Sequence, residues 1–462
     1  MPNVPPATIF HAMTRPLLHE HSPSARGGVT DSRLAAAEIC ADLRTGELLD
    51  SSFDRRTSRL EPRDRRWTRE LVYGMLRRRS RLDALLAERV SGGLARLDAD
   101  VIDLLRLGAY QLLFMGSVPA YAAIAQTVEL AKQRHGLGAS KLANAVLRRV
   151  ERERDALSLP HVLDPVDALA LRHSHPRWLV ARWVARWGAR ETEHLLDCNN
   201  SEPATVLRPF GIVREQLEAT LESAGVRIED APLVSDSIQL TSSVSLVELG
   251  AFRKGLFFVQ DPASTLVVRY ANVPAGSVVA DLCASPGGKA LELSRDARHV
   301  IAMDRSQARV ERLMTNLRRL EAPTVIPMVG DARFPAIRPV DAVLVDAPCT
   351  GTGTFRRHPD ARWRLKVSDL AVTAAMQRSL LSAAATVVRP GGLLIYSTCS
   401  LEPEENDAQV ERFLAENPDW RLEPPAEGVV PASVLDAGRL RVLPHRHGVD
   451  GAFAARLRRV SG

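Results

Sequence analysis

Two cysteines and one aspartate stand in short loops that each follow an apolar run of the sequence. Asp346 and Cys349 lie three residues apart in the loop Asp-Ala-Pro-Cys-Thr-Gly-Thr-Gly, and Cys399 follows the next apolar run. A thiolate is a nucleophile that can form a covalent intermediate, and a carboxyl group can hydrogen-bond to a reacting base or exchange a proton with it. Two thiols beside a carboxyl group therefore indicate covalent catalysis.

Alkylation of a pyrimidine at C5 is a reaction that needs this combination. C5 is a poor nucleophile, but a thiolate that adds to C6 converts the ring to an enamine, whose C5 can attack an electrophilic methyl group. N3 needs a hydrogen-bond donor as charge builds there, and a base must remove the C5 proton before the thiol leaves. The alternative, in which Cys349 and Cys399 are buried core thiols, leaves the motifs around them unexplained.

A glycine-rich turn precedes these loops, between a short apolar run and a helical pattern. It reads Asp-Leu-Cys-Ala-Ser-Pro-Gly-Gly-Lys over residues 281–289. Glycines let the backbone approach a ligand, and the first free N–H groups of a helix point at it. Asp304 lies roughly 20 residues further on, where doubly wound folds place a carboxylate on ribose hydroxyls. Asp331 follows the third apolar run and is either a partner for a purine amine or a turn residue.

The elements that must position these residues alternate between strand and helix from residue 276 onward. The predicted strands are 278–280, 300–303, 325–329, 342–345 and 393–396, and the predicted helices include 310–317 and 370–388. This alternation predicts a parallel sheet with helices on both faces. Four of the strands end at Asp281, Asp304, Asp346 and Cys399, so these side chains should converge on one crevice at the carboxyl ends of the strands.

The first third of the chain, residues 31–154, carries only helical patterns, and arginines gather in it. The densest cluster is Arg77-Arg78-Arg79-Ser80-Arg81. A single cluster of this kind is most often a solvated helix face, although arginine is also well suited to phosphate. Residues 160–202 form a helical connection, in which Trp178, Trp183 and Trp187 are predicted to be packing anchors. Residues 205–266 mix helix and strand signals and predict a small α+β unit.

The composition is that of an ordinary globular protein, and it excludes several classes. In 462 residues, 61 Lys and Arg against 55 Asp and Glu give a net charge of +6, which permits a nucleic-acid partner without requiring one. The five cysteines form no Cys-x-x-Cys pair, so we expect no metal site and no disulfide framework. No run is apolar enough to span a membrane and no signal peptide is recognisable, which predicts a cytoplasmic protein with no membrane partner.

These motifs resemble those of bacterial S-adenosylmethionine-dependent RNA cytosine-5 methyltransferases of the NSUN-like family. Residues 281–289 are similar to the family's cofactor motif, with Ser285 where Ala is usual, and residues 346–353 and 398–400 match its two cysteine loops. Over the ordered length the sequence resembles the RsmB (Sun/Fmu) branch, because residues 31–154 look like a NusB-type RNA-binding domain. Residues 259–264 are similar to a short signature just before the catalytic domain.

The resemblance implies a fold of three kinds of domain: an all-α NusB-like N-terminal domain, a small α+β subdomain, and an α/β Rossmann-like class I methyltransferase domain. The expected division is 1–30 extension, 31–155 helical domain, 156–202 connector, 203–270 subdomain and 271–462 methyltransferase domain.

The resemblance also implies roles for individual residues. Cys399 would be the nucleophile, Cys349 would assist product release, and Asp346 would contact N3 and the amino group of the base. The cofactor S-adenosyl-L-methionine would be held by Cys283, Ala284, Ser285, Pro286, Gly287, Gly288, Lys289, Asp304, Asp331 and Asp346. The charge of Lys289 would favour a thiolate nearby.

The expected activity is methylation of one cytosine of 16S, small-subunit ribosomal RNA by a monomeric enzyme. Transfer RNA as substrate, and an RNA-binding antitermination or assembly factor with a vestigial methyltransferase domain, are the alternatives. A DNA methyltransferase is disfavoured, because those enzymes use the Pro-Cys loop thiol, whereas here Thr350 follows it and a second thiol is present. Two departures from the family pattern are the sequence Leu-Arg-Pro-Phe at 207–210, where Leu-Arg-Val-Asn is usual, and Ala452, where an aromatic residue is usual.

Overall fold

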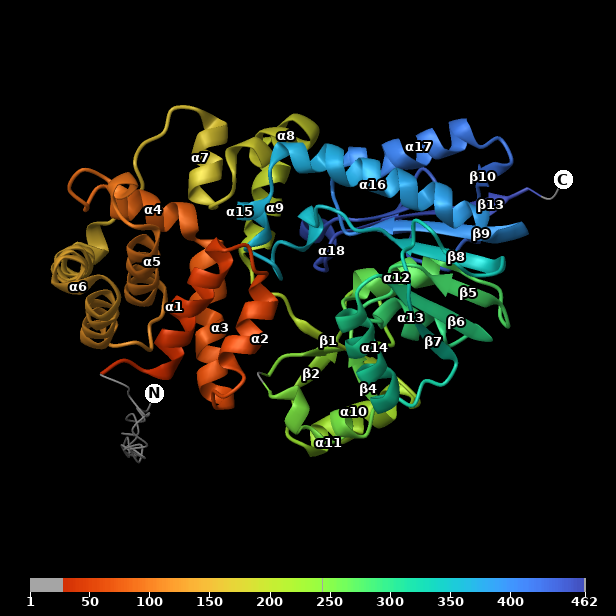
Figure 1. Ribbon diagram of the computed structural model, residues 1–462, viewed down its shortest axis with the longest axis horizontal. Helices are drawn as coiled ribbons and strands as arrows, with labels where there is room; N and C mark the ends of the chain where they lie inside the picture. Colours follow the sequence, from red (N-terminus) through yellow and green to blue (C-terminus); the bar gives the residue numbers. More distant parts are fainter. Residues whose placement is uncertain (1–27, 243, 461–462) are drawn as a thin grey trace, which may run out of the picture.

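The computed structural model describes residues 28–242 and 244–460, so nearly all of the expected extension at 1–30 lies outside the described residues. Four parts follow one another along the chain: a helical domain, a helical connector, a small α+β subdomain and a large α/β domain (Figure 1). The predicted fold class is confirmed. Across the described ranges, none of the helices combines the length and the apolar character needed to cross a membrane.

The helical domain is a bundle around one hydrophobic core. Its helices are α1 (Asp31–Arg44), α2 (Leu49–Thr57), α3 (Pro62–Arg77), α4 (Arg79–Ala87), α5 (Ala99–Phe114) and α6 (Ala120–Arg152). Apolar residues recur on one face of each long helix, and Leu71, Leu105 and Leu147 from three different helices are fully buried together. Inside α6, Gly136 takes a φ of 78°, which bends the helix where a side chain would be strained.

The connector consists of α7 (Pro165–Arg172), α8 (Arg177–Trp187) and α9 (Ala189–Asn200). Trp183 is fully buried, as predicted for a packing anchor, and its ring nitrogen donates to Glu402 Oε1 at 3.0 Å. Arg362 contacts the C-terminal end of α9, since its guanidinium donates to the backbone oxygen of Asn199 and to Oδ1 of Asn200, both at 2.8 Å.

The α+β subdomain has one antiparallel sheet with the strand order β2-β3-β1-β4. Its elements are β1 (Thr205–Pro209), α10 (Arg214–Ser223), β2 (Ile228–Asp230), β3 (Ile238–Leu240), α11 (Gly250–Arg253) and β4 (Phe257–Val259). The unusual Pro209 and Phe210 are packing residues: the Phe210 ring meets Phe258 at 6.0 Å, and Arg295 of the next domain donates to the Pro209 carbonyl.

The large domain is built on a nine-stranded sheet with the order β11-β12-β13-β9-β8-β5-β6-β7, and β10 pairs with β13. The strands are β5 (Val278–Asp281), β6 (His299–Asp304), β7 (Val325–Val329), β8 (Val340–Asp346), β9 (Val388–Thr398), β10 (Trp420–Leu422), β11 (Leu435–Asp436), β12 (Arg439–Val442) and β13 (Ala452–Arg459). Strands β5 to β9 pair in parallel, as predicted.

The prediction of a purely parallel sheet was wrong at the C-terminal edge, where β10 to β13 are antiparallel. No crossover helix connects β11 to β12. A two-residue turn joins them instead, and its residues Ala437 and Gly438 both take positive φ, of 48° and 75°. Such turns match the twist of a hairpin, but an alanine at the first position hides the signal in the sequence.

Helices cover both faces of this sheet (Figure 1). On one side lie α12 (Pro262–Ala271), α13 (Gly288–Leu293) and α14 (Gln307–Arg319), and on the other lie α16 (Val367–Thr386) and α17 (Asp407–Glu416). Successive residues of β9 alternate between the two cores: Leu393 and Ile395 belong to the first, Leu394 and Tyr396 to the second. Ala452 is buried in the first core, so a small residue is accommodated there.

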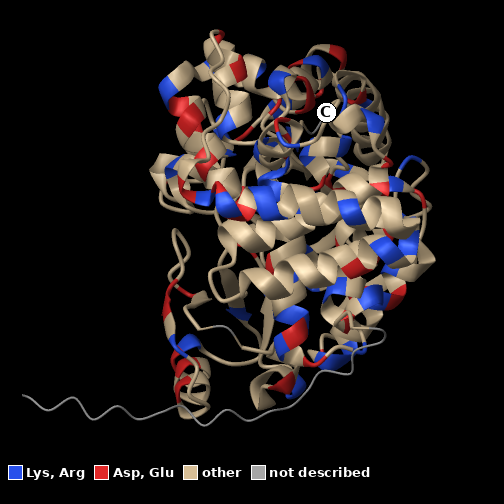
Figure 2. Ribbon diagram, turned by 90° about the vertical axis from the view of Figure 1, so that its left-hand side faces the viewer, with Lys and Arg blue, Asp and Glu red and all other residues tan. Residues whose placement is uncertain are grey.

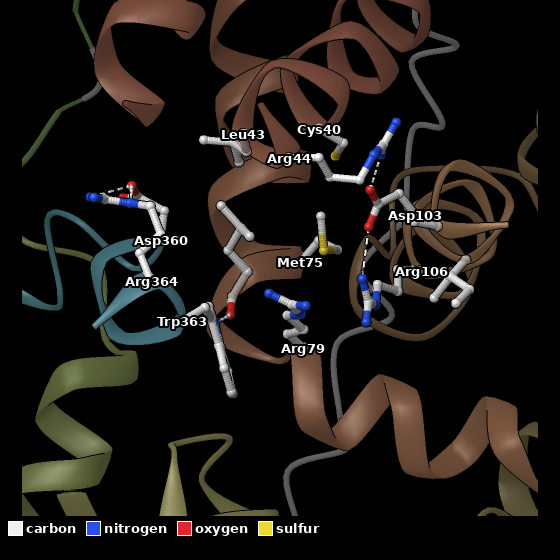
Figure 3. Close-up of a pocket in the computed structure, with 13 residues that line it drawn as sticks. Cys40, Leu43, Arg44, Met75, Arg79, Asp103, Arg106, Asp360, Trp363 and Arg364 are labelled. Atoms are coloured by element: carbon white, nitrogen blue, oxygen red, sulfur yellow. Dashed lines mark hydrogen bonds and ion pairs between the residues drawn. The ribbon is translucent and has the colours of Figure 1, made fainter. Parts of the chain in front are cut away.

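The helical domain packs against α15 (Ala361–Arg364) of the large domain, across a cavity of about 320 Å³ (Figure 3). Arg79 extends into this cavity, with its guanidinium 5.3 Å from the ring centroid of Trp363. The ring nitrogen of Trp363 donates to the backbone oxygen of Leu76 at 2.9 Å. Part of the arginine-rich sequence therefore lies at a contact between domains.

Candidate active site

The predicted site residues Asp281, Asp346 and Cys399 lie at the carboxyl ends of β5, β8 and β9. These three strands are neighbours in the sheet, and the register places Asp281 beside Leu344, and Asp346 beside Ser397. From β5 the chain proceeds to β6 on one side of it, and β8 lies on the other, so the order of the strands reverses here. Open α/β sheets bind ligands at such a switch point, beyond the carboxyl ends of the strands.

The two predicted catalytic thiols lie face to face, with 3.4 Å between the Sγ atoms of Cys349 and Cys399. The loops that carry them are tied by a hydrogen bond from the N–H of Gly353 to the backbone oxygen of Cys399, at 2.9 Å. The hydrogen bond from the Cys349 thiol lowers the pKa of Cys399, and the same contact raises the pKa of Cys349 well above its ordinary value. Cys399 is therefore the thiol of the pair that ionises first.

Asp346 connects the thiols to the glycine-rich turn. Its Oδ2 accepts a hydrogen bond from Lys289 Nζ at 2.8 Å, and its Oδ1 accepts one from the Ser397 hydroxyl, also at 2.8 Å. Burial opposes the charge of Lys289, but the Asp346 carboxylate outweighs it, and the pKa of the amine is raised. The Lys289 cation in turn contributes to the low pKa of Cys399, as expected from the sequence.

The loop of Cys349 is held in place by a fully buried carboxylate that the sequence analysis missed. Glu405 accepts a hydrogen bond from the backbone N–H of Thr350 at 2.9 Å, another from the Thr350 hydroxyl, and a third from the Gln377 amide at 3.1 Å. In the sequence, Glu405 follows two other glutamates closely and resembles a residue of a solvated turn. Only its contacts with a loop 55 residues earlier reveal the role.

A cavity of about 460 Å³ opens beside these groups. Seven of the predicted cofactor-site residues line it: Cys283, Ala284, Ser285, Pro286, Gly288, Lys289 and Asp346. Gly287 belongs to the same turn but does not line the cavity. The position requires glycine, because its φ is 111° and a Cβ on it would lie 2.4 Å from Leu313. Asp304 and Asp331 are not among the residues that line the cavity.

Asp304 and Asp331 lie beyond this cavity at the ends of the neighbouring strands. Asp304 is buried at the end of β6 and accepts a hydrogen bond from the Ser306 N–H at 2.9 Å. Asp331 follows β7, where hydrogen bonds from Arg333 lower the pKa of its carboxyl group to about 2. The carboxyl end of β6 still adjoins the turn, since the Ala284 N–H donates to the Met303 oxygen at 2.8 Å.

Three buried polar atoms on the cavity wall have no hydrogen-bond partner within the described part of the chain. They are Oδ2 of Asp281, Oγ of Ser285 and Nε2 of Gln260. Burial raises the pKa of Asp281 to about 7, and the nearby Asp346 adds to this. Buried polar atoms are normally paired, so a set of unpaired donors and acceptors on one wall indicates a polar ligand.

Four charged side chains that the sequence analysis did not single out, two of them buried and two half-buried, connect three segments that are distant in sequence. Arg356 contacts Asp450 at 2.7 Å and Asp261 at 3.2 Å, and Arg357 contacts the same carboxylates at 2.5 and 2.6 Å. Asp261 belongs to the signature at 259–264, and Asp450 lies two residues before Ala452. The two carboxylates are 189 residues apart in sequence, so no local pattern could show that they share partners.

Elsewhere, basic and acidic residues are interspersed along the helices (Figure 2). In the helical domain Arg56 contacts Glu38 and Asp42, each at 2.8 Å. Arg77, in the arginine cluster at 77–81, instead donates to the backbone oxygen of Arg356 at 2.8 Å. It therefore contacts the segment that follows the Cys349 loop.

Three family models match successive parts of the chain. The NusB family matches residues 30–152, a ferredoxin-like domain of RsmF/B-like methyltransferases matches residues 175–247, and the 16S rRNA methyltransferase RsmB/F family matches residues 271–458. The resemblance to a NusB-type domain followed by a methyltransferase domain is thereby confirmed.

Full-length relatives agree with these matches. A probable ribosomal RNA small subunit methyltransferase B of Synechocystis is 34% identical over 93% of this chain and 99% of its own, and the Vibrio cholerae ribosomal RNA small subunit methyltransferase B is 33% identical over 93% and 98%. The crystal structure of the protein PH0851 superposes with a TM-score of 0.79 at 25% identity, over 94% of this chain and 100% of its own. The chain therefore belongs to the RsmB/F family of 16S rRNA methyltransferases.

Proposed function

We propose that this protein transfers a methyl group from S-adenosyl-L-methionine to C5 of a cytosine in 16S ribosomal RNA, through a covalent adduct between Cys399 and C6. The observation that carries the proposal is the pair of thiols 3.4 Å apart, of which Cys399 has the lowered pKa, beside the Lys289–Asp346 pair. Activation of a poor carbon nucleophile requires a thiolate and a carboxyl group at one place, and both stand at the switch point of the sheet.

The residues of the large cavity suit the cofactor. Its volume of about 460 Å³ falls in the range of small-molecule sites, and its unpaired Asp281 and Gln260 atoms offer an acceptor and a donor to a ligand that carries both an amine and a carboxylate. A Cβ on Gly288 would stand 3.0 Å from Gln260, so glycine keeps this wall open. When bound, S-adenosyl-L-methionine supplies an electrophilic methyl group; we assign its contacts to the ten residues named from the sequence, with Asp304 and Asp331 at the outer end.

The chain's own groups account for the remaining steps. The Cys399 thiolate forms the S–C6 bond and pushes an electron pair toward C5, while Asp346 interacts with N3 and the amino group of the base. After C5 has gained its methyl group, a base removes the C5 proton, the C5–C6 double bond is restored, and the S–C6 bond breaks with its electron pair leaving on the Cys399 sulfur. We assign to Cys349 the support of this last step, because its thiol lies 3.4 Å from the sulfur that must leave as a thiolate and can donate a hydrogen bond to it.

Ribosomal RNA is the proposed substrate because the relatives that match almost the whole chain are named as small-subunit ribosomal RNA methyltransferases. We propose that residues 31–155 and 203–270 bind the RNA, that 156–202 connects them, and that 271–462 carries out the chemistry. A base must leave its stack to reach a buried thiol, so the target cytosine should be flipped or lie in a single-stranded loop.

Transfer of labelled methyl from S-adenosyl-L-methionine to protein-free small-subunit ribosomal RNA tests this function. Transfer RNA and duplex DNA are run alongside, with wild type, Cys399→Ala, Cys349→Ala and the control Cys198→Ala, whose thiol lies in the connector. We expect label at C5 of one ribosomal cytosine, none with Cys399→Ala, and unchanged transfer with Cys198→Ala. Cys349→Ala should accumulate protein joined to RNA. Label in transfer RNA alone, or transfer that survives Cys399→Ala, would contradict the proposal.

A further inference from the structure

A second cleft, of about 490 Å³, lies between the helical domain and the catalytic loops. Residues 48–51, at the start of α2, line one side of it, and Gly351 and His358 line the other. A Cβ placed on Gly351 would lie 4.0 Å from the Cys399 sulfur, so this cleft borders the nucleophile. Ser285, Pro286 and His358 line both this cleft and the larger cavity, so the two spaces adjoin.

His358 is held in the cleft by a carboxylate of the other domain. Its Nδ1 lies 2.9 Å from Oδ2 of Asp50 on α2. The second oxygen of Asp50 accepts a hydrogen bond from the Tyr73 hydroxyl at 2.5 Å, and the Arg69 guanidinium lies 4.4 Å from the centroid of the Tyr73 ring. Contacts within the helical domain therefore hold the Asp50 side chain in place, independently of its contact with His358.

The charges around His358 favour an imidazolium. Burial opposes its charge, but Asp50 outweighs burial and the pKa of His358 is raised; Asp360 in the following turn and Cys399 act in the same direction. Arg364 of α15 lines the same cleft, paired with Asp360 at 2.9 Å.

Two arginines complete the set of charges around the cleft. Arg309 and Arg312 face it from α14, and Arg309 lies 4.0 Å from Asp304. The cleft thus combines cations on three elements with an opening beside the proposed nucleophile, which suits a polyanionic strand.

We propose that the helical domain completes the catalytic site: Asp50 holds His358 as a cation in the cleft through which the target nucleotide reaches Cys399, and this cation favours the Cys399 thiolate. The inference rests on the proposed function, and it assigns the helical domain a part in the chemistry in addition to RNA binding. Asp50 and His358 are positioning residues, since Asp50 acts through His358 and His358 acts through the thiol. The hydrogen bond with Cys349 is the main cause of the lowered pKa of Cys399, and the charges of Lys289 and His358 act in the same direction.

The test uses the full-length protein with Asp50→Asn, His358→Gln and the double variant. Asp54→Asn is the matched control, because Asp54 lies on the same helix and its exposed carboxylate pairs with Arg65 on the surface, at 2.6 Å. Three quantities are measured for each variant: the alkylation rate of Cys399 by iodoacetamide from pH 6 to pH 9, read by peptide mass spectrometry; kcat and KM for methylation of the ribosomal RNA; and the melting temperature.

We expect Asp50→Asn and His358→Gln each to slow alkylation of Cys399 at pH 7 about tenfold, which corresponds to a thiol pKa about one unit higher. The kcat should fall by a similar factor, with KM for RNA unchanged, and the double variant should lose no more than either single variant. Asp54→Asn should match wild type. A loss confined to KM or to the melting temperature, or unchanged alkylation in both single variants, would overturn the coupling.

The two proposals separate in this experiment because alkylation needs no RNA. If the wild type methylates ribosomal cytosine and both single variants keep the wild-type alkylation rate, the coupling is refuted and the proposed function stands. A wild type whose Cys399 reactivity depends on Asp50 and His358, but which transfers no methyl group to RNA, would refute the proposed function and leave the coupling supported.

Discussion

The site depends on individual side chains whose ionisation is set by close neighbours. Cys399, Cys349 and Asp346 could all be predicted as site residues from the sequence, because each stands at the end of a strand or in the loop that follows it, and the strand ends of such a sheet converge. The relative acidity of the two thiols could not, since it depends on a 3.4 Å contact between loops and on Lys289 across the sheet. The residue types indicate which chemistry is available, and the distances between the side chains indicate which thiol is placed to carry it out.

Asp281 gives a prediction at this scale. Its folded-state pKa, raised to about 7, lies above the ordinary value of 3.8, so the folded protein binds an extra proton between these pH values and loses stability as pH rises through them. Asp281→Asn keeps the shape without the charge. We expect it to raise the free energy of unfolding of the cofactor-free protein at pH 8 by up to roughly 4 kcal/mol, and by almost nothing at pH 4. Urea unfolding at both pH values measures this, and equal changes at the two would contradict it.

At the scale of elements, the strands and helices of the large domain follow the sequence pattern closely from β5 to β9. The sequence pattern did not show two features. The hairpin of β11 and β12 depends on two positive φ values, one of them at an alanine, and the end of α9 is held by hydrogen bonds from Arg362 of the large domain. The 259–264 signature was recognised as a motif, but its purpose depends on Asp261 meeting Arg356 and Arg357.

The four-charge cluster gives a prediction for these elements. Arg356→Met removes one guanidinium group, while the carboxylates of Asp261 and Asp450, whose side chains are each 8% exposed, stay beside each other. Breaking a buried ion pair in this way costs about 3–5 kcal/mol, so we expect a loss of stability of that size in urea unfolding. Asp436→Asn is the control, since its carboxylate is largely exposed and pairs with Arg441 at 2.8 Å; its cost should stay below about 1 kcal/mol. Similar costs for the two variants would show that the cluster adds nothing beyond a surface pair.

At the scale of the whole molecule, the domains are joined by buried polar contacts as well as by the chain. The sequence predicted the order and type of the domains, because each has its own periodicity, but it contained no signal for how they pack. Arg362 shows why: it is fully buried and donates to backbone oxygens of Ser174 and Asn199 more than 160 residues away. Burial lowers the pKa of this guanidinium to about 9.

Arg362→Met gives a prediction for the assembled molecule. The substitution keeps most of the apolar stem but leaves buried carbonyl oxygens of the connector without a donor. Each unsatisfied group costs about 1–3 kcal/mol, so we expect roughly 3 kcal/mol or more in total, with earlier loss of contact between the connector and the large domain. Hydrogen exchange should show faster exchange in α9 and α15, while β5 to β8 stay protected. Uniform faster exchange throughout would indicate general destabilisation instead.

The closeness of the two thiols has a consequence outside the methylation reaction. Peroxide converts a thiolate to a sulfenic acid, which a neighbouring thiol attacks to give a disulfide and water. Cys399 is the more readily ionised thiol and Cys349 lies next to it, so oxidant damage should stop at a disulfide between them. A reductant can reverse that bond, whereas it cannot reverse a sulfinic acid. Cys349, for which we propose a part in product release, would thus also make the oxidation of Cys399 reversible.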